Sequence, residues 1–506
     1  MKYNLFIHFI PKALLSRKWL PLALSAAFLC GSCKKYLDVN TTPNNPTVVP
    51  PSVLLPTTTI GIAFANGNDL DRATSALVQH IAGVANQTAS YDVYNFSGAF
   101  DNQWTGEIYG GAISNLVLLI NMDSATSPVY SGIAKLEMAY AFSMAADIWG
   151  DIPYSQAGQG LKYESPRFDK VQDIYEGNSA LGITSLFDLV KSGLADLDKT
   201  SVLKPGKDDI VYGGDLSKWK RMGNTLLLKF AIQLTNADPA LATSVINDVL
   251  TGNNYINSNS LDFAVPFSTG VGNQNPIFSF NNVNRNSDQM LSTRFLNLEK
   301  SLNDTVRLGK FFTKPTGSFV SFDNGSTAIV PALATRSRYN TYNTGDRSGN
   351  TADGKLGGDT AIRLLTNFQV NFILAEAALI LGTPGDPNAY YQAGITASMQ
   401  KAGMTGTEID TYFNDNPTVV TLSGTVEQQR QQIITQKYIA WVGNGIEAFN
   451  DYRRTGYPVL ALVNNPSGDD PTTIPTRLPY TNTELSTNKN APNPRPLTNV
   501  KLWWAK

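Results

Sequence analysis

Apolar residues recur at spacings of three and four along several segments of this chain, and this period constrains its fold more than any other feature. Residues 131–148, 217–236 and 426–441 each place their large apolar side chains on one helical face. Residues 366–381 lead through a Gly- and Pro-rich breaker into a second helical pattern at 388–402, a unit the size of one tetratricopeptide-like repeat. We therefore expect one elaborated domain of interleaved helices and long loops.

Long polar stretches separate these helical segments. They are rich in Asn, Gly, Ser, Thr and Pro, carry interspersed aromatic residues, and cover residues 34–58, 86–104, 251–290, 312–361 and 464–497. Loops longer than about 15 residues within a compact domain usually either bind something or are disordered. The aromatic content argues against disorder for most of them.

The amino-terminal residues have the three parts of a bacterial export signal. Basic residues within 12–18 precede the apolar run 19–29, which is shorter than the ~20 residues that a membrane-spanning helix needs. Cys30 and Cys33 follow, and the small residues directly before Cys33 favour it as the lipidation site. We predict a lipoprotein signal peptide at residues 1–32 and an acylated Cys33. A plain secreted protein with an incidental cysteine is the alternative.

Cleavage before Cys33 would leave His80 as the one histidine and would leave no free thiol. Zinc and copper sites usually draw on several His or Cys side chains, and triad hydrolysis usually needs a histidine base. We therefore expect no metal site and no catalytic residue. His80 falls in an apolar helical run at 76–84 and is predicted to be packed rather than to act as a base.

Composition and motifs exclude further classes of function. The chain is 42% hydrophobic and 16% charged with a net charge of -1, so it can bury a sizeable core and shows no bias toward nucleic acid. No dinucleotide-binding glycine motif after a strand, Walker A sequence or zinc-protease motif occurs. No cofactor is expected.

Short segments spread over the whole chain carry a family resemblance. They are CKKYLDVN at 33–40, DIWGDIPYS at 147–155, WKR at 219–221, LAEA at 374–377, EAFNDYRRTGYP at 447–458 and RLPY at 477–480. Together with the lipoprotein signal, their order and spacing resemble the SusD/RagB family of outer-membrane nutrient-binding lipoproteins. The subgroup that the chain resembles most is the SusD-like starch-binding one.

The resemblance implies a mainly α fold in which tetratricopeptide-like helix pairs form a scaffold with long, loop-rich insertions. It implies a single SusD-like domain at residues 33–506. Within this domain, the helical scaffold covers about 70–250 and 360–455, a loop-rich insertion about 251–360, and a C-terminal loop segment 456–506.

The resemblance also implies a function and partners. The protein would be a non-catalytic cell-surface lipoprotein that captures oligosaccharides and delivers them to a TonB-dependent outer-membrane barrel transporter of the SusC-like kind. Acylated Cys33 would contact outer-membrane lipid. Lys34 and Lys35 depart from the acidic residues that often follow the cysteine in surface-exported lipoproteins, so the outward-facing location rests on the family resemblance.

Shared family motifs are interpreted as structural rather than as the binding site. Trp149 follows a helical face, Gly150 fits a helix stop, and Pro153 fixes the next turn. The acidic and basic residues Asp451, Arg453 and Arg454 are expected to form a charge-assisted network that pins a loop, with an anion site as the alternative.

Sugar recognition needs aromatic faces for the apolar sides of pyranose rings and planar polar groups for the hydroxyls. The stretch 87–104 is the first choice, and the segments 273–289 and 336–343 join it on family architecture. The expected ligand-binding residues are Tyr91, Asp92, Tyr94, Asn95, Phe96, Trp104, Phe278, Asn282, Arg285, Arg336, Tyr339 and Tyr342. Trp104 also begins a helical pattern that runs to Leu118, so it is equally a core candidate.

Two other functions stay open. A surface glycoside hydrolase would need two carboxylates roughly 5–9.5 Å apart across a cleft. Candidate acids for such a pair are Asp92, Asp101, Asp147 and Asp151. A binding lipoprotein for peptides is the second alternative, since related uptake systems can import peptides instead of sugars.

Overall fold

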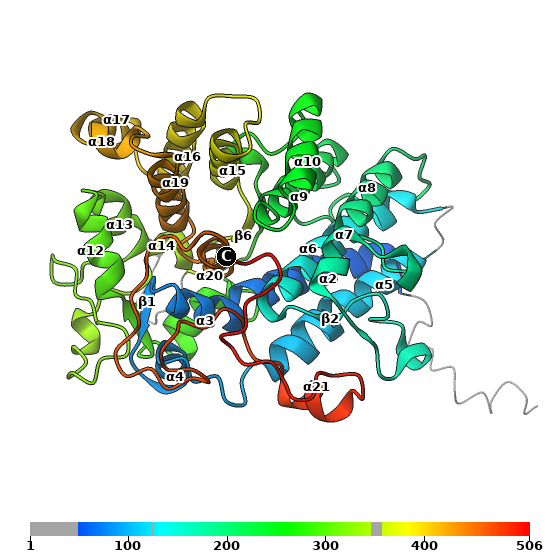
Figure 1. Ribbon diagram of the computed structural model, residues 1–506, viewed down its shortest axis with the longest axis horizontal. Helices are drawn as coiled ribbons and strands as arrows, with labels where there is room; N and C mark the ends of the chain where they lie inside the picture. Colours follow the sequence, from blue (N-terminus) through cyan, green and yellow to red (C-terminus); the bar gives the residue numbers. More distant parts are fainter. Residues whose placement is uncertain (1–48, 123–125, 346–356) are drawn as a thin grey trace, which may run out of the picture. The chain divides into compact units, whose positions relative to one another are not determined.

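A computed structural model describes residues 49–122, 126–345 and 357–506. Residues Pro51–Lys506 form one compact unit, and most of its regular structure is helical (Figure 1). The expected mainly α fold is therefore confirmed. The predicted signal peptide at 1–32 and the predicted lipidation site Cys33 lie outside the described residues.

The elements follow one another as short helices joined by irregular segments. The α-helices up to residue 252 are α2 (Pro51–Gly67), α3 (Asp69–Leu77), α4 (Asn86–Asp92), α5 (Ser114–Asn121), α6 (Pro128–Trp149), α7 (Val171–Glu176), α8 (Leu186–Leu197), α9 (Leu216–Gln233) and α10 (Pro239–Gly252). Those that follow are α11 (Pro276–Phe278), α12 (Thr293–Ser301), α13 (Thr305–Phe311), α14 (Thr341–Thr344), α15 (Asn367–Ile380), α16 (Pro387–Lys401), α17 (Gly406–Asp415), α18 (Pro417–Val420), α19 (Val426–Ala440), α20 (Gly445–Thr455) and α21 (Asn482–Thr487).

Helices of other geometry and short strands complete the list. The π-helices are η2 (Asn102–Ile113) and η6 (Ser279–Asn284), and the 3₁₀ turns are η3 (Gly160–Tyr163), η4 (Ser179–Leu181), η5 (Asn259–Leu261) and η7 (Leu333–Thr335). The strands β1 (Ile81–Gly83), β2 (Ile152–Pro153), β3 (Phe168–Asp169), β4 (Phe263–Val265), β5 (Gln289–Leu291) and β6 (Ile362–Leu365) pair as β1–β5, β2–β3 and β4–β6, each antiparallel.

The helices that the apolar period predicts are present as α6, α9, α15, α16 and α19, with bounds within a few residues of those expected. Side-chain caps explain where they begin. The Asp215 carboxylate accepts from backbone N–H groups in the first turn of α9, and Thr425 forms a reciprocal capping box with Gln428 at the start of α19. Gly150, at φ +84°, ends α6 as predicted.

Neighbouring helices pack in pairs, which is the scaffold expected of tetratricopeptide-like repeats (Figure 1). The pairs are α6 with α8, α9 with α10, and α15 with α16, and α19 packs on α15. Backbones approach closely where α6 meets α8, because a Cβ at Gly132 would lie 2.8 Å from the carbonyl oxygen of Gly193. Any larger side chain at either glycine would push these two helices apart.

The prediction of a helix at 76–84 is correct only as far as Leu77 and is wrong beyond it. Helix α3 ends at Leu77, Gln79 takes a left-handed conformation at φ 64°, and β1 follows to pair with β5. Pairing with a strand more than 200 residues away overrides the local apolar period.

His80 is a packed core residue, as predicted. Its side chain is fully buried, Nε2 lies 3.0 Å from the carbonyl oxygen of Tyr438, and the two rings lie 4.2 Å apart. Burial lowers the pKa of His80 to about 3, so the imidazole stays neutral at physiological pH.

The family motif at residues 147–150 is part of the core, which agrees with its structural interpretation. Trp149 is fully buried, donates from Nε1 to the carbonyl oxygen of Pro479 at 3.0 Å, and meets Trp104 edge to face at 5.0 Å. Asp147 accepts a hydrogen bond from the hydroxyl of Tyr175 at 2.7 Å. The motif therefore joins α6 to the C-terminal segment.

A buried charge network links α15, α19 and α20. Both carboxylate oxygens of Glu376 accept from Arg454, at 2.6 and 2.7 Å, and Arg430 adds a contact at 2.9 Å. Asp451 pairs with Arg454 and with Lys437, each at 2.9 Å. The expected charge network is thus present for Asp451 and Arg454, but it joins three helices rather than pinning a loop.

Arg453 has a different role from its neighbour Arg454. It donates from Nη1 to the carbonyl oxygens of Asp147 and Thr476, so it ties α20 to α6 and to the C-terminal segment. Arg454 donates to described carboxylate oxygens, and Arg453 donates to described carbonyl oxygens. These contacts favour a structural role for both arginines over an anion site.

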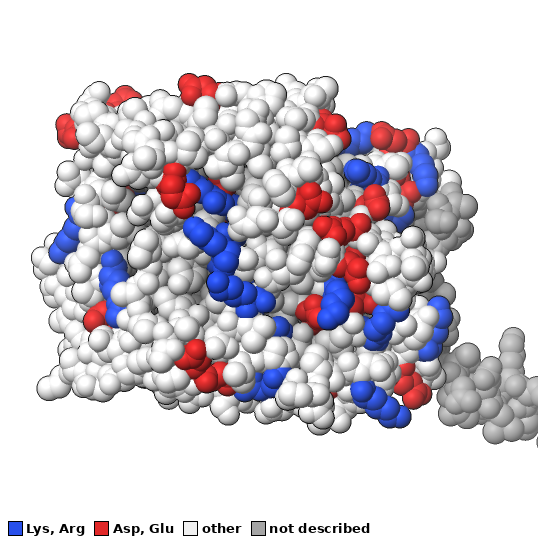
Figure 2. Space-filling model, in the orientation of Figure 1, with Lys and Arg blue, Asp and Glu red and all other residues white. Residues whose placement is uncertain are grey.

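Several stretches expected to be loops contain short elements. The stretch 86–104 holds α4 and the start of η2, and the stretch 464–497 holds α21. Among the described residues, no helix is both long enough and apolar enough to cross a membrane. Acidic and basic side chains are interspersed over the face drawn in Figure 2, in keeping with the small net charge.

Candidate functional site

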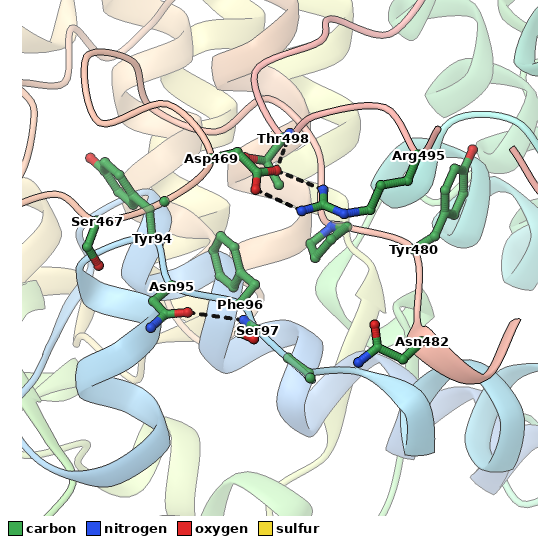
Figure 3. A pocket seen from close by; sticks show the side chains of 14 residues that line it. Tyr94, Asn95, Phe96, Ser97, Ser467, Asp469, Tyr480, Asn482, Arg495 and Thr498 are labelled. Atoms are coloured by element: carbon green, nitrogen blue, oxygen red, sulfur yellow. Dashed lines mark hydrogen bonds and ion pairs between the residues drawn. The ribbon is translucent and has the colours of Figure 1, made fainter. Parts of the chain in front are cut away.

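The turn between α4 and η2 and the C-terminal segment enclose a pocket of about 280 Å³ (Figure 3). Its walls come from residues 94–99 on one side and from parts of 467–498 on the other. The lining residues are Tyr94, Asn95, Phe96, Ser97, Gly98, Ala99, Ser467, Gly468, Asp469, Pro479, Tyr480, Asn482, Arg495 and Thr498. This volume lies just below the roughly 300–1,000 Å³ typical of ligand sites.

Backbone contacts hold the two walls together. The N–H of Ser467 donates to the carbonyl oxygen of Val93 at 2.8 Å, and the N–H of Val463 donates to the hydroxyl of Tyr94 at 3.2 Å. Gly468 allows this approach, because a Cβ there would lie 2.7 Å from the carbonyl oxygen of Tyr94. The pocket therefore depends on a glycine in the C-terminal segment.

One ion pair fixes the back of the pocket. Arg495 donates to both carboxylate oxygens of Asp469 at 2.8 Å, and the N–H of Thr498 donates to the same carboxylate at 3.0 Å (Figure 3). The hydrogen bonds from Arg495 are the main cause that lowers the pKa of Asp469. Asp469 is the one acidic side chain among the lining residues described, and it is held ionised by this pairing.

Polar groups at the mouth of the pocket are available to a ligand. No described residue accepts from the side-chain N–H groups of Asn95 or of Asn482, and both residues are exposed. Phe96 and Pro479 also line the pocket and supply its apolar surface, although little of the Phe96 ring is exposed. Amide groups beside an apolar surface suit a ligand that carries hydroxyl groups on an apolar ring.

A second concave surface lies at the predicted segment 336–343. Arg336 and Arg338 line a groove of about 550 Å³ whose other lining residues are Thr313, Pro315, Leu333 and Ala334. Arg336 contacts the carbonyl oxygen of Ser287, and Arg338 contacts that of Asn281. The predicted segments 273–289 and 336–343 therefore lie together.

All seven aromatic residues of the predicted ligand-binding set are buried, although Tyr94 and Phe96 still line the pocket at residues 94–99. Tyr91 is 1% exposed, donates to Asp69 at 2.8 Å and stacks on Phe100 at 5.5 Å. The other buried aromatic residues of the predicted set are Tyr94, Phe96, Trp104, Phe278, Tyr339 and Tyr342. Exposing a large ring to water costs more free energy than the polar groups of a loop can offset, so these rings pack into the core. We therefore no longer expect Tyr91, Trp104, Phe278, Tyr339 and Tyr342 to contact a ligand, and we keep Tyr94 and Phe96, which line the pocket.

The remaining predicted residues differ in accessibility. Asn95 and Arg285 are exposed, whereas Asn282 and Arg336 are half-buried. Tyr342 packs beneath the guanidinium of Arg363 at 3.7 Å and has a structural role.

Asp92 is also part of the packed structure, although its pKa is raised. It is 1% exposed and accepts from the side chain of Asn324 and the N–H of Gly325, at 2.6 and 2.5 Å. Burial raises its pKa to about 7 despite these hydrogen bonds. The hydrogen bonds tie the first predicted segment to residues 324 and 325.

The other three acids considered for a hydrolase are engaged in the scaffold. Asp101 accepts from the N–H of Thr483 at 3.0 Å, and Asp151 accepts from the N–H of Val171 at 2.9 Å. Asp147 is buried at the end of α6. None of the four lines the pocket at residues 94–99.

Sequence reasoning did not single out Gly468, Asp469, Asn482 or Arg495. The length and composition of the polar stretch 464–497 were the signal that marked their region. Which of its residues meet residues 94–99 depends on contacts between segments more than 370 positions apart.

Together these features define a mainly α protein of paired helices with loop-built surface pockets. The chain belongs to the SusD-like family described as starch-binding and associating with the outer membrane, whose profile matches residues 43–481. No curated protein matches the sequence.

Solved structures share this fold at low sequence identity. A chitin-binding protein is 22% identical with a TM-score of 0.71, and the match covers 90% of this chain and 100% of that one. A SusD homologue from Bacteroides uniformis is 23% identical with a TM-score of 0.70, covering 90% and 99% of the two chains. A chitin-binding SusD homologue from Flavobacterium johnsoniae is 20% identical with a TM-score of 0.69, covering 90% and 97%. The fold expected from the resemblance is confirmed.

Proposed function

We propose that this protein is a non-catalytic, lipid-anchored component of the outer membrane that binds oligosaccharides and delivers them to a TonB-dependent barrel transporter. The family match over residues 43–481 carries the proposal. Chitin-binding proteins among the structural neighbours support a glycan as the ligand. The pocket at residues 94–99 is the site proposed for a sugar unit, because it joins free amide groups to apolar surface.

Substitutions at Asn95 and Asn482 test this site. Replacing both by alanine is expected to weaken binding of the recognised glycan about tenfold, since each lost hydrogen bond contributes about 0.5–1.5 kcal/mol. A glycan array on the mature protein in detergent identifies the ligand, and calorimetric titration measures the change. Asn257→Ala, at an exposed asparagine outside the pocket, is the matched control. Unchanged affinity of the double variant would remove this pocket from the proposal.

Membrane attachment is tested separately from ligand binding. Cys33→Ala is expected to move the protein from the membrane fraction to the soluble periplasmic or secreted fraction, because no acyl chains would remain to hold it. Cys30→Ala, three residues earlier and inside the predicted signal peptide, should leave the protein in the membrane fraction. Fractionation followed by immunoblotting checks both, and a Cys33→Ala protein that stays membrane-bound contradicts the anchor.

A further inference from the structure

Two arginines share one face of the groove at residues 313–338. Arg336 and Arg338 flank Ser337, which is fully buried and whose N–H donates to the carbonyl oxygen of Val320 at 3.0 Å. Alternate side chains of an extended segment point to the same side. Both guanidinium groups therefore line the groove of about 550 Å³.

Backbone carbonyl groups fix the positions of both guanidinium groups. The acceptors are the carbonyl oxygens of Pro331 and Ser287 for Arg336, each at 2.7 Å, and those of Asn281 and Asn286 for Arg338, each at 3.2 Å. A guanidinium has five N–H donors, and no described residue accepts from Nη2 of either arginine. Hydrogen bonds to backbone carbonyl groups thus hold each side chain in place, while the two N–H donors of its Nη2 remain available.

The positive charge of this pair is not compensated within the described residues. No described carboxylate forms an ion pair with Arg336 or Arg338, whereas Arg294 and Arg495 each pair with an aspartate at 2.8 Å. Partial burial, and then the neighbouring charge of Arg336, lower the pKa of Arg338, yet an arginine stays protonated at physiological pH. Two like charges held side by side favour an anion between them.

We propose that the groove at Arg336 and Arg338 binds the carboxylate or sulfate group of an acidic sugar unit. Guanidinium forks match the oxygen atoms of both groups. Pro315 and Leu333 supply an apolar wall for the ring that carries the acid. The proposal rests on the proposed function in taking the ligand to be an oligosaccharide, and it adds that the oligosaccharide is acidic.

The test compares three probes on the mature protein in detergent: an oligogalacturonate, the same oligomer with every carboxylate methyl-esterified, and inorganic sulfate. We expect the acidic oligomer to bind about tenfold more tightly than its neutral ester, as one charge-assisted contact would give. The preference should shrink as salt is added. Sulfate should compete with the acidic oligomer for the unsubstituted protein, so this part of the test does not depend on a variant that folds.

Substitutions test whether Arg336 and Arg338 cause the preference for the acidic oligomer. The double change Arg336→Gln and Arg338→Gln should abolish the preference for the acidic oligomer, with thermal unfolding as the check on folding. Arg221→Gln is the matched control, because Arg221 is also half-buried and donates to a backbone carbonyl, that of Tyr255 at 2.9 Å. That control should keep the wild-type preference.

The outcomes separate this inference from the proposed function. Equal binding of acid and ester, or a preference that survives the double change, overturns the acidic-ligand inference while glycan binding stands. Sulfate binding that needs both arginines, without binding of any sugar on the array, supports the anion site and overturns the glycan-binding function. Absence of saturable binding of both the acidic oligomer and sulfate overturns the anion site itself.

Discussion

Replacing Glu376 by glutamine should lower the free energy of unfolding by about 3–5 kcal/mol, because breaking a buried ion pair leaves uncompensated charge in the core. Arg454 and Arg430 would lose the carboxylate that they now share, and Arg454 would keep only Asp451, which also pairs with Lys437. Urea denaturation of the two proteins at neutral pH measures the difference. A loss below 1 kcal/mol would mean that the network contributes little.

The same substitution makes a prediction about pH. Burial by itself would raise the pKa of Glu376, but Arg454 and then Arg430 outweigh it and bring the pKa to about 2. A carboxyl whose pKa is depressed on folding stabilises the protein above its unfolded value of about 4.5, and the contribution is lost as pH falls toward 2. The difference between wild type and variant should therefore be full at neutral pH and shrink below about pH 4.5.

An exposed ion pair between Glu427 of α19 and Lys506 is the control for this charge effect, whereas Glu376 lies on α15. Glu427 lies 3.5 Å from Lys506, and both side chains are more than half exposed. Glu427→Gln should change the stability by only about 0–1 kcal/mol, as is usual for surface pairs. Equal effects at Glu376 and Glu427 would show that burial is not what makes the network important.

The second large effect is expected at Trp149. Trp149→Ala should cost about 3–5 kcal/mol of unfolding free energy, because it opens a cavity in the core and leaves the carbonyl group of Pro479 without its donor. Chemical denaturation followed by circular dichroism measures the loss. Trp503→Ala provides the matched comparison, since that ring is only partly buried and should cost less.

A result at Trp149 bears on the site as well as on stability. Pro479 lines the pocket at residues 94–99, and Trp149 is the residue that holds its carbonyl group. We expect the folded fraction of Trp149→Ala to keep its glycan affinity, because the walls of the pocket are also joined through Ser467 and Tyr94. Loss of affinity in that fraction would mean that α6 positions the pocket directly.

The sequence by itself determined the helical scaffold. Helices such as α9 and α19 are set by an apolar period and by caps within a few residues of their ends, so local interactions suffice to predict them. The family motifs at Trp149 and at Arg454 were also interpreted correctly as structural, because Gly150 and Pro153 indicate a helix end and guanidinium groups pair with nearby carboxylates.

Only the tertiary structure decided which side chains are accessible. Tyr91 and Trp104 look like stacking platforms in a polar stretch, yet each is at most 2% exposed, since burying a large ring is worth more than exposing it. The proposed pocket depends on Gly468 reaching Tyr94 across more than 370 residues. Local patterns carry no information on such contacts, because their free energy comes from surfaces that meet only after the helices have packed.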